Sequence, residues 1–356
     1  MTLEDFLTEW RNAADTVLVH TSGSTGKPKP LRVEKRRMLN SARITCDFLG
    51  LHPGDAFLLC MPLDYIAGKM VVVRCIERRL RLFSIKPSGH PMAWRGDIEC
   101  VDFSESNPSI GHCASLPSEI SAVAMVPLQV YNSLQVAEER ERLKAVGHLI
   151  IGGGAIDDRM AKELRDFPNC VWSTYGMTET LSHIALRRLS GKEAGEWYTP
   201  FDSVTVSQTA DGCLTIDAPM VHDGLLKTND IVEMMTVTVN GKVVRQFRVR
   251  GRKDNVIDSG GIKIQIEEVE AALKPFLKKP FAITKVADGK FGETVTLVTE
   301  ATDMAEMAEV CANALPKYWQ PHRYIHVERL PMTETGKPAR RQIEQMAAKV
   351  AVDVSR

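Results

Sequence analysis

Short apolar segments recur along the first 250 residues, and longer amphipathic segments separate them. Strands are predicted where β-branched and large apolar residues gather, at Val17–His20, Ala56–Met61, Val123–Val126, His148–Ile151 and Val171–Tyr175. Helices are predicted at Glu34–Leu49 and Leu128–Lys144. Because strands and helices alternate, we expect sheets that are covered by helices. Residues 1–250 are therefore predicted to form one large α/β domain.

The pattern changes near residue 203, where strand-like segments follow one another closely. Thr236–Val239 and Lys242–Val249 flank the dipeptide Asn240-Gly241. Asn-Gly is typical of a tight hairpin, because both turn positions need positive φ. We expect residues 203–250 to form a β-rich part of the large domain.

A second, smaller domain is predicted to span residues 251–356, after the polar segment Gly251–Asp254. Its length lies within the ordinary range for a domain. The fold class is then mixed α/β, with a large domain of helix-covered sheets and a small, mobile α+β domain. The elements expected in the small domain are a helix from Gln265 to Phe276, strands at Phe281–Val286 and Thr294–Thr299, a helix at Met304–Leu315 and a last helix from Pro338.

Composition excludes several functional classes. The 356 residues include 45 Lys and Arg and 45 Asp and Glu, so the formal net charge is zero and nucleic acid is not an expected partner. No apolar run approaches the ~20 residues of a membrane span, and the acidic N-terminus does not resemble a signal peptide. The eight cysteines have neither C-x-x-C nor zinc-site spacing. We expect free thiols in a reducing cytoplasm.

The strongest chemical signal follows the first strand, in the segment Thr21-Ser22-Gly23-Ser24-Thr25-Gly26-Lys27. Glycines let a backbone approach an anion closely, and N–H groups and hydroxyls can donate to its oxygens. Lys27 adds a positive charge. The spacing differs from the Walker loop. A phosphate-binding loop is predicted, with a flexible Gly/Ser linker as the alternative.

This loop and several later segments, in the same order, resemble the adenylate-forming superfamily of AMP-binding enzymes and acyl-CoA synthetases. Such enzymes activate a carboxylic acid with ATP as an acyl-adenylate. The resemblance runs from Thr16 to Lys337. No later segment suffices alone, but their ordered combination is specific. The segments are Met61–Gly68, Ile151–Ala155, Tyr175–Thr180, Thr228–Asp230, Gly251–Ile264 and Pro331–Lys337.

The resemblance implies a nucleotide site. Tyr175, followed by Gly176, would stack on adenine, and Thr178 would contact the α-phosphate. Glu179 would bind Mg²⁺, which prefers a carboxylate combined with phosphate oxygens, although a helix-capping role is the alternative. Asp230 and Arg252 would contact the ribose. One wall of the adenine site would consist of Gly152, Gly153, Gly154 and Ala155, which could also be only a strand-to-helix turn.

One position departs from the family pattern. Thr228-Asn229-Asp230 stands where relatives have Thr-Gly-Asp. Asn is tolerable there because it also visits left-handed conformations.

The resemblance also implies moving parts. Asp254 would be the hinge of the small domain. Lys337 would be catalytic, bridging the substrate carboxylate and the α-phosphate, because a cation stabilises the charge that develops there. A solvated surface lysine is the alternative. The turn Ser259-Gly260-Gly261 would approach the nucleotide or the thiol of CoA.

The acid is predicted from a second set of residues. Thr180-Leu181-Ser182-His183-Ile184 resembles the o-succinylbenzoate–CoA ligases of menaquinone biosynthesis, in which Ser182 and His183 would line the acyl pocket. Tyr65 would be a gate residue, or a core residue with an exposed hydroxyl. Lys69 and Arg74 could bind a second anionic group. Five residues apart on a helix they do not share a face, so at most one should point inward, and both could be surface charges.

The implied activity is that of an ATP-dependent acid–CoA ligase that uses ATP, Mg²⁺ and CoA. The alternatives are another aryl- or acyl-CoA ligase, a stand-alone adenylation enzyme that loads a carrier protein, and a nucleotide-binding regulator that has lost catalysis. Only twenty residues precede the phosphate loop, where most relatives have a much longer segment. We expect a compact member that opens with an amphipathic helix. The sequence leaves open whether the chain forms a homodimer.

Overall fold

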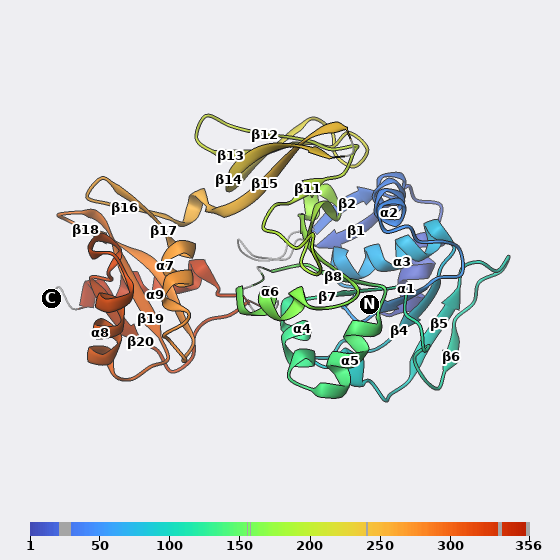
Figure 1. Cartoon of the computed structure of the whole chain (residues 1–356), viewed down its shortest axis with the longest axis horizontal. Coiled ribbons are helices and arrows are strands. Elements are labelled where there is room, and N and C mark those ends of the chain that lie inside the picture. Colours follow the sequence, from blue (N-terminus) through green and yellow to red (C-terminus); the bar gives the residue numbers. More distant parts are fainter. Residues whose placement is uncertain (21–29, 155, 157, 240, 334–336, 354–356) are drawn as a thin grey trace.

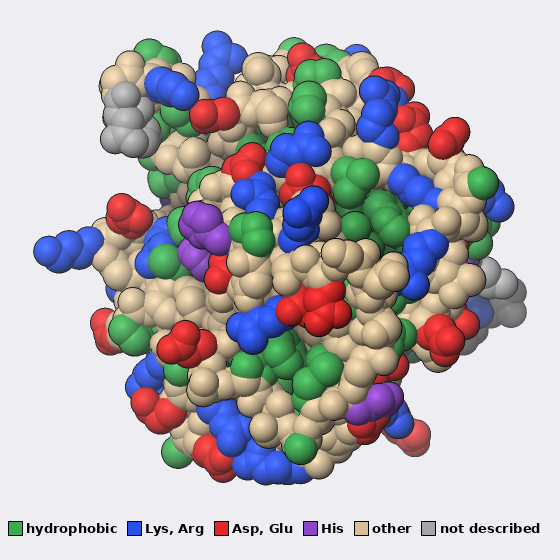
Figure 2. Space-filling view, turned by 90° about the vertical axis from the view of Figure 1, so that its right-hand side faces the viewer, with side chains coloured by type: hydrophobic (Ala, Val, Ile, Leu, Met, Phe, Trp, Pro, Cys, Tyr) green, Lys and Arg blue, Asp and Glu red, His purple; other side chains and the backbone are tan. Residues whose placement is uncertain are grey.

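A computed structural model of the chain describes residues 1–20, 30–154, 156, 158–239, 241–333 and 337–353. The chain forms a larger and a smaller body, with a long β-ribbon above them (Figure 1). The N-terminus lies in the larger body and the C-terminus at the far side of the smaller one. Charged side chains of both signs are interspersed on the face shown in Figure 2.

The larger body is built on a nine-stranded sheet whose spatial order is β11-β10-β9-β8-β7-β3-β4-β5-β6. The five strands from β9 to β4 run parallel, and those outside them pair antiparallel. The bounds are β3 Ala56–Leu59, β4 Arg81–Ser84, β5 Ile98–Asp102, β6 Gly111–Cys113, β7 Ala122–Met125, β8 His148–Ile151, β9 Cys170–Gly176, β10 His183–Arg188 and β11 Thr199–Pro200.

Helices cover both faces of this sheet, as the sequence predicts. Alternate side chains of β3 leave the sheet on opposite sides. Phe57 and Leu59 join the apolar cluster that includes α2 (Lys35–Leu49) and α3 (Ile66–Arg78). Ala56 and Leu58 join a second cluster with the helices α4 (Pro127–Leu134), α5 (Ala137–Ala145) and α6 (Asp158–Arg165). The mixed α/β fold class is therefore confirmed.

One predicted helix is in fact two. The sequence predicts a single helix over Leu128–Lys144, whereas α4 ends at Leu134 and α5 begins at Ala137. The Arg140 guanidinium donates from Nε and Nη2 to the carbonyl oxygen of Leu134, at 3.0 and 2.7 Å. These bonds satisfy a carbonyl that the helix end leaves without an intrahelical partner. The break is thus stabilised by a side chain one turn further along.

The N-terminal segment forms the amphipathic helix that the sequence predicts. Helix α1 (Leu3–Arg11) starts with a capping box between Thr2 and Asp5 and buries Leu3, Phe6 and Leu7. A two-stranded antiparallel sheet follows, made of β1 (Thr16–His20) and β2 (Pro30–Glu34). The backbone N–H of Leu18 donates to Glu9 Oε1 at 3.0 Å. Helix α1 is therefore tied to the strand that leads to the predicted phosphate loop.

The β-ribbon is a four-stranded antiparallel sheet in the order β12-β13-β14-β15. Its strands are β12 Thr205–Gln208, β13 Cys213–Asp217, β14 Leu225–Val239 and β15 Lys242–Arg252. The predicted hairpin is confirmed, since Val239 pairs with Lys242 and Gly241 has a φ of +77°; Asn240 lies outside the described residues. Both strands of the hairpin are longer than predicted.

The smaller body follows the short 3₁₀ turn η3 (Lys253–Asn255). Helices α7 and α8 pack on one apolar cluster, and α9 covers a second one. Its elements are β16 Val256–Ser259, β17 Ile262–Gln265, α7 Ile266–Leu273, β18 Phe281–Asp288, β19 Gly292–Thr299, α8 Met304–Ala314, β20 Arg323–His326 and α9 Arg340–Asp353. The domain limits 1–250 and 251–356 stay predictions. Within the described part of the chain, no helix has the length and apolar character that crossing a membrane requires.

Candidate active site

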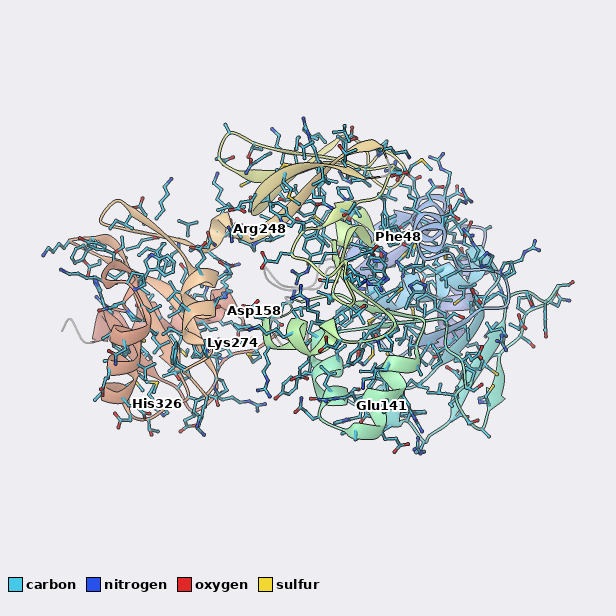
Figure 3. The ribbon with its side chains drawn as sticks, in the orientation of Figure 1. Phe48, Glu141, Asp158, Arg248, Lys274 and His326 are labelled. Atoms are coloured by element: carbon cyan, nitrogen blue, oxygen red, sulfur yellow. The ribbon has the colours of Figure 1, made fainter. Side chains whose placement is uncertain are left out.

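The carboxyl ends of the parallel strands β3, β7, β8 and β9 meet at one edge of the large sheet. The strand order changes direction between β3 and β7: β4 follows β3 on one side, whereas β8 and β9 follow β7 on the other side. Open parallel sheets bind ligands at such a switch point, outside the carboxyl ends. In Figure 3 Asp158, at the start of α6, lies on the side of the larger body that faces the smaller one, which carries Lys274 and His326. The predicted segments that begin at Met61, Ile151 and Tyr175 leave the sheet at this edge.

The glycine segment after β8 is closely packed. A Cβ on Gly152 would lie 2.6 Å from Thr174 Oγ1, and Gly153 has a φ of +80°. A Cβ on Gly154 would lie 3.2 Å from Pro127 and 3.7 Å from Lys337 Cε. Side chains are therefore excluded at Gly152 and strained at Gly153. The contact at Gly154 shows that Lys337 extends from the smaller body to this segment.

A hydrogen-bonded group joins β9 to the ribbon. The Tyr175 hydroxyl donates to Asp230 Oδ2 at 2.5 Å, and Arg252 Nη1 donates to Asp230 Oδ1 at 3.2 Å. The ring of Tyr175 meets Phe247 edge to face, with centroids 4.9 Å apart. Burial, and then the Asp230 charge, raise the pKa of Tyr175 far above its usual range. Tyr175 is thus a neutral hydroxyl whose position is fixed by packing and by one carboxylate.

An irregularity in β14 orients the side chain of Asp230, which is predicted to bind the ribose. Register with β13 shifts between Cys213↔Ile231 and Thr215↔Lys227, which leaves residues 228–230 opposite Leu214. Thr228 Oγ1 donates to the carbonyl oxygen of Leu214 at 2.9 Å and accepts from the N–H of Asp230 at 3.1 Å. Bulges commonly re-aim side chains beside active sites. Here the bulge directs Asp230 to Tyr175 and Asn229 to Asp254.

Lys337 is presented by a tight loop of the smaller body. The N–H of Lys337 donates to Thr333 Oγ1 at 3.1 Å, and its carbonyl accepts from the N–H of Thr333 at 2.7 Å. Burial lowers the pKa of Lys337, the charge of Arg252 lowers it further, and the charge of Asp230 opposes both. Lys337 is therefore half-buried beside the predicted nucleotide-site residues Arg252 and Asp230 and is not a fully solvated surface lysine. Residues 334–336 lie outside the described part of the chain.

A strained turn separates the predicted phosphate and metal ligands from the predicted acyl residues. Thr178 is buried, Glu179 is exposed, and both lie in the 3₁₀ turn η2 (Thr178–Thr180). Leu181 follows with a φ of +64°, and the N–H of Ser182 donates to the carbonyl of Thr180 at 2.7 Å. This is a γ-turn, which is rare because it is strained. Strain of this kind gathers at functional sites.

Gly176 allows the next strand to pass close by. A Cβ on Gly176 would lie 2.2 Å from the carbonyl oxygen of Ser182 and 2.5 Å from His183 Cα. Any other residue would push β10 away, and with it both predicted acyl residues. Gly176 therefore has a packing role in addition to its place in the nucleotide motif.

The predicted acyl residues lie in a buried polar cluster that we name the acyl corner: Ser41, Thr45, Arg74, Ser182 and His183. Arg74 Nη2 donates to Ser182 Oγ at 2.6 Å, and Ser182 Oγ lies 3.4 Å from His183 Nδ1. The Arg74 side chain is 3% exposed, and its Nε has no partner among the described residues. Burial lowers the pKa of Arg74 to about 10, so the guanidinium stays charged at neutral pH.

The hydrogen bonds of the cluster specify one tautomer of His183. Thr45 Oγ1 donates to the carbonyl oxygen of Ser41 at 3.1 Å, so it must accept from His183 Nε2, which lies 3.0 Å away. Nδ1 is then unprotonated and can accept from the Ser182 hydroxyl. Burial, and then the charge of Arg74, lower the pKa of His183 well below its usual range. The chain of bonds fixes Ser182 as the acceptor for Arg74.

Lys69 lies elsewhere. Its ammonium group is 3.2 Å from Met1 Sδ, 3.8 Å from Glu9 Oε2 and 5.2 Å from the ring centre of Phe6, all in the N-terminal segment. Lys69 therefore packs under α1, while Arg74 contacts Ser182. The expectation that at most one of them points into the acyl pocket stays a prediction. The alternative that both are surface charges is wrong, since they are 1% and 3% exposed.

Other predicted residues are placed less directly. Tyr65 is half-buried at the start of α3 and pairs with His20, the last residue before the predicted phosphate loop. Thr21–Lys27 and Ala155 lie outside the described residues. Gly260 and Gly261 form the two-residue turn between β16 and β17, and the N–H of Gly260 donates to the carbonyl of Phe291 within the smaller body.

Sequence reasoning missed Ser41 and Thr45. Both lie four residues apart on the buried face of α2, among Met38, Ala42 and Leu49. A polar pair at that spacing within an apolar stripe was the available signal. Its partner could not be inferred, because His183 lies 138 residues further along the chain.

The chain is similar to known proteins along most of its length. Residues 7–206 match the family described as AMP-binding enzyme. The curated 2-succinylbenzoate–CoA ligase of Bacillus cytotoxicus is 24% identical over 95% of this chain and 71% of its own length. The ligase of the same name from Bacillus velezensis is 25% identical over 92% of this chain and 68% of its own length.

Solved structures agree with the fold. An acyl-CoA synthetase (AMP-forming)/AMP-acid ligase II-like protein from Dyadobacter fermentans is 30% identical, with a TM-score of 0.59, over 95% of this chain and 91% of its own. MenE, the o-succinylbenzoate CoA synthetase of Bacillus subtilis, in complex with its acyl-adenylate, has a TM-score of 0.66 at 20% identity, over 92% of this chain and 68% of its own. The chain belongs to the AMP-binding enzyme family and is an AMP-forming acid–CoA ligase.

Proposed function

We propose that this enzyme converts o-succinylbenzoate to o-succinylbenzoyl-CoA, a step of menaquinone biosynthesis, through an acyl-adenylate. The names of its curated relatives support this substrate. The observation that carries it is the buried guanidinium of Arg74, which faces Ser182 and has an unpartnered Nε. All eight cysteines are free thiols, which supports a reducing compartment such as the cytoplasm.

The argument from Arg74 is electrostatic. A buried charge is costly unless an opposite charge or several hydrogen bonds compensate it. In the acyl corner the guanidinium contacts the neutral hydroxyl of Ser182, and Nε faces no described acceptor. A carboxylate would accept from Nε and Nη2 together, in the two-pronged geometry that suits arginine. An acid with two carboxylates could therefore hold one at Arg74 and present the other to ATP.

The nucleotide would lie on the other side of the γ-turn. The glycine wall Gly152–Gly154 and the Tyr175 ring would hold adenine. Asp230, which can only accept hydrogen bonds when ionised, would accept from the ribose hydroxyls beside Arg252. Thr178 would contact the α-phosphate, and the loop Thr21–Lys27 the β- and γ-phosphates. The described residues support this role by their chemistry and position, and Thr21–Lys27 supports it by its chemistry alone.

Glu179 suits a magnesium ion. Its side chain is exposed at the turn η2, next to Thr178. No cluster of three His, Cys, Asp or Glu residues occurs within the described ranges. Glu179 would therefore supply one ligand and the phosphates the others, as Mg²⁺ commonly requires. A bound ion would neutralise charge on the phosphates and the departing pyrophosphate.

In the first half-reaction a carboxylate oxygen of the acid attacks the α-phosphorus of ATP. A P–O bond forms, the bond to the bridging oxygen of the β-phosphate breaks, and pyrophosphate leaves with the electron pair. Lys337 already extends to Gly154 and is close enough to Asp230 for its pKa to respond. Its ammonium group would reduce the repulsion between carboxylate and phosphate and stabilise the charge of the transition state.

In the second half-reaction the sulfur of CoA attacks the acyl carbon. The C–S bond forms, the bond from the acyl carbon to the AMP oxygen breaks, and AMP leaves while the thiol proton passes to solvent. We expect the smaller body to rotate about Asp254 between the two steps, which would remove Lys337. The turn Ser259–Gly261 would then approach the thiol.

The decisive test is pyrophosphate release with ATP and Mg²⁺ in the presence of o-succinylbenzoate, benzoate, acetate or a medium-chain fatty acid, with and without CoA. We expect release with o-succinylbenzoate and a CoA thioester as the product. Release with another acid would replace the substrate and keep the chemistry. A product formed on a carrier protein and not on CoA would favour the carrier-loading alternative. The absence of pyrophosphate release with every acid would favour a nucleotide-binding regulator.

A pair of substitutions distinguishes a role of Arg74 in binding the acid from a general effect on folding. Arg74→Gln should raise the KM for o-succinylbenzoate about 30-fold or more, the range for a buried charge that loses its partner, with the KM for ATP unchanged. Lys69→Gln is the matched control, because Lys69 is equally buried on the same helix but faces α1. An equal rise in both variants would contradict the proposed role of Arg74.

A further inference from the structure

Two consecutive residues of the connection, Asp254 and Asn255, form side-chain hydrogen bonds with different parts of the protein. Arg252 Nη2 and Asn229 Nδ2 both donate to the carboxylate of Asp254 from strands of the ribbon. Asn255 Nδ2, one residue later, donates to Glu267 of α7 in the smaller body. Gln265 Nε2 of the smaller body also donates to the carbonyl oxygen of Arg252. A rotation about Asp254 would therefore have to break this bond as well as those from Asn229 and Arg252.

Asn229 holds Asp254 in one orientation. Its Nδ2 lies 3.1 Å from both carboxylate oxygens of Asp254. Arg252 Nη2 donates to Oδ2 of the same carboxylate at 3.0 Å, while its Nη1 donates to Asp230 at 3.2 Å. The carboxylate is thus held by two donors that both belong to the ribbon. This pair of contacts, from Asn229 and Arg252 to Asp254, is named the clasp.

The clasp exists in the arrangement that brings Lys337 to Gly154. A change of φ or ψ at Asp254 would swing its carboxylate away from Asn229, because the side chain moves with its own backbone. Asn229 is placed for this contact by the bulge in β14, where the neighbouring Asp230 points to Tyr175 instead. A glycine at position 229 would have no side chain to make the contact.

We propose that Asn229 is a positioning residue for the adenylation half-reaction: it holds Asp254 so that the smaller body presents Lys337 to the nucleotide. This inference rests on the proposed function and adds a residue to it. Asn229 acts through Asp254 and contacts neither nucleotide nor acid. Because Asn229 and Asp254 are both exposed to solvent, the loss of this hydrogen bond is expected to shift the two-state equilibrium by only about three- to tenfold.

Two variants of Asn229 test the clasp. Asn229→Gly removes the donor, and Asn229→Asp puts a second negative charge opposite Asp254. Asp202→Asn is the matched control, because Asp202 forms an exposed ion pair with Lys242, 3.1 Å away at the other end of the ribbon hairpin. Both positions are exposed, so folding should be preserved.

The first readout does not need activity. Trypsin can cut after Arg250, Arg252 and Lys253, in the segment that leads into Asp254. We expect cleavage there to be about three- to tenfold faster in Asn229→Gly, faster still in Asn229→Asp, and unchanged in Asp202→Asn. Unchanged cleavage in both Asn229 variants would overturn the proposal, whether or not the enzyme activates any acid.

The second readout compares the half-reactions. Single-turnover pyrophosphate release should fall about three- to tenfold in Asn229→Gly, whereas thioester formation from supplied acyl-adenylate should be unchanged or faster. Equal losses in both steps, or no loss in either, would overturn the positioning role. If wild-type protein released no pyrophosphate with any acid, the proposed function would fail, and the trypsin result alone would decide whether the clasp exists.

Discussion

The nucleotide corner and the acyl corner are built in opposite ways. Tyr175, Asp230, Arg252 and Lys337 come from β9, the ribbon and the smaller body, and partly exposed side chains neutralise one another. The acyl corner lies within the larger body, is almost fully buried, and leaves Arg74 Nε without a described partner. The first can be taken apart when the smaller body moves. The second lies within one body, so movement of the smaller body would leave its contacts unchanged.

We therefore expect the nucleotide corner to set the rate of a single half-reaction and the acyl corner to set which acid is accepted. Groups that cross between the bodies can be present in one half-reaction and absent in the other. Groups within one body remain for both steps, so they can hold the acid while its chemistry changes. The variants below should accordingly affect either a single half-reaction or the choice of acid.

The largest effect is expected from Lys337→Ala. Pyrophosphate release should fall on the order of a hundred- to a thousandfold, the usual loss when one preorganised group of the transition state is removed. Thioester formation from supplied acyl-adenylate should change little, because Lys337 would then be withdrawn. Lys279→Ala, on the exposed surface of the smaller body, is the control. Equal losses in both steps would remove the basis for distinguishing the two corners.

A smaller effect is expected from Asp230→Asn. The substitution removes the charge that Arg252 and Tyr175 share, and a hydrogen bond to a charged group contributes about 1.5–3 kcal/mol. We expect the KM for ATP to rise about 10- to 100-fold and the KM for the acid to stay constant. Steady-state titrations of both substrates measure this, with the exposed Asp217→Asn of the same sheet as control. A rise for the acid alone would contradict the assignment.

The nucleotide corner could largely be predicted from the sequence. Glycines at positions 152–154 and 176 and the acidic residue 230 occur in short motifs, because close backbone approach and the expected contact with ribose restrict the residue type locally. The close packing of Gly176 against Ser182, and the contact of Asn229 with Asp254, could be seen only in the fold. The roles of these residues stay predictions until they are measured.

The acyl corner could be predicted only in part. Ser182 and His183 follow a motif, but Lys69 and Arg74 are equivalent candidates in the sequence. The contacts of α1 with Lys69 and of Ser182 with Arg74 distinguish them. Thr45 has no local signal of its partner. Likewise, the break between α4 and α5 depends on the side chain of Arg140, whose contact no periodicity reveals.

Thr45→Val should disturb the acyl corner without removing a charge. The His183 Nε2–H would lose its acceptor, which costs about 1–3 kcal/mol when the donor is buried. We expect lower stability and a KM for the acid that rises by roughly a few fold, with adenine binding unchanged, because His183 and Ser182 would no longer fix Arg74. Thr294→Val, buried in the smaller body, is the control. An unchanged KM for the acid would confine Thr45 to a structural role.

The smallest effect is a pH dependence of stability. Burial lowers the pKa of His183 well below its usual value, so the folded protein keeps the ring neutral while the unfolded chain protonates it below about pH 6.5. The stabilisation is therefore fully present above that pH and is lost as the pH falls. Between pH 7.5 and 5.5 one such group contributes a loss of about 1.4 kcal/mol. Urea unfolding followed by tryptophan fluorescence should show this loss in the wild type and a smaller one in His183→Gln. Equal losses in both proteins would mean that the ring titrates in the folded protein as it does in the unfolded chain, and His183 Nδ1 would then donate to Ser182 below that pH.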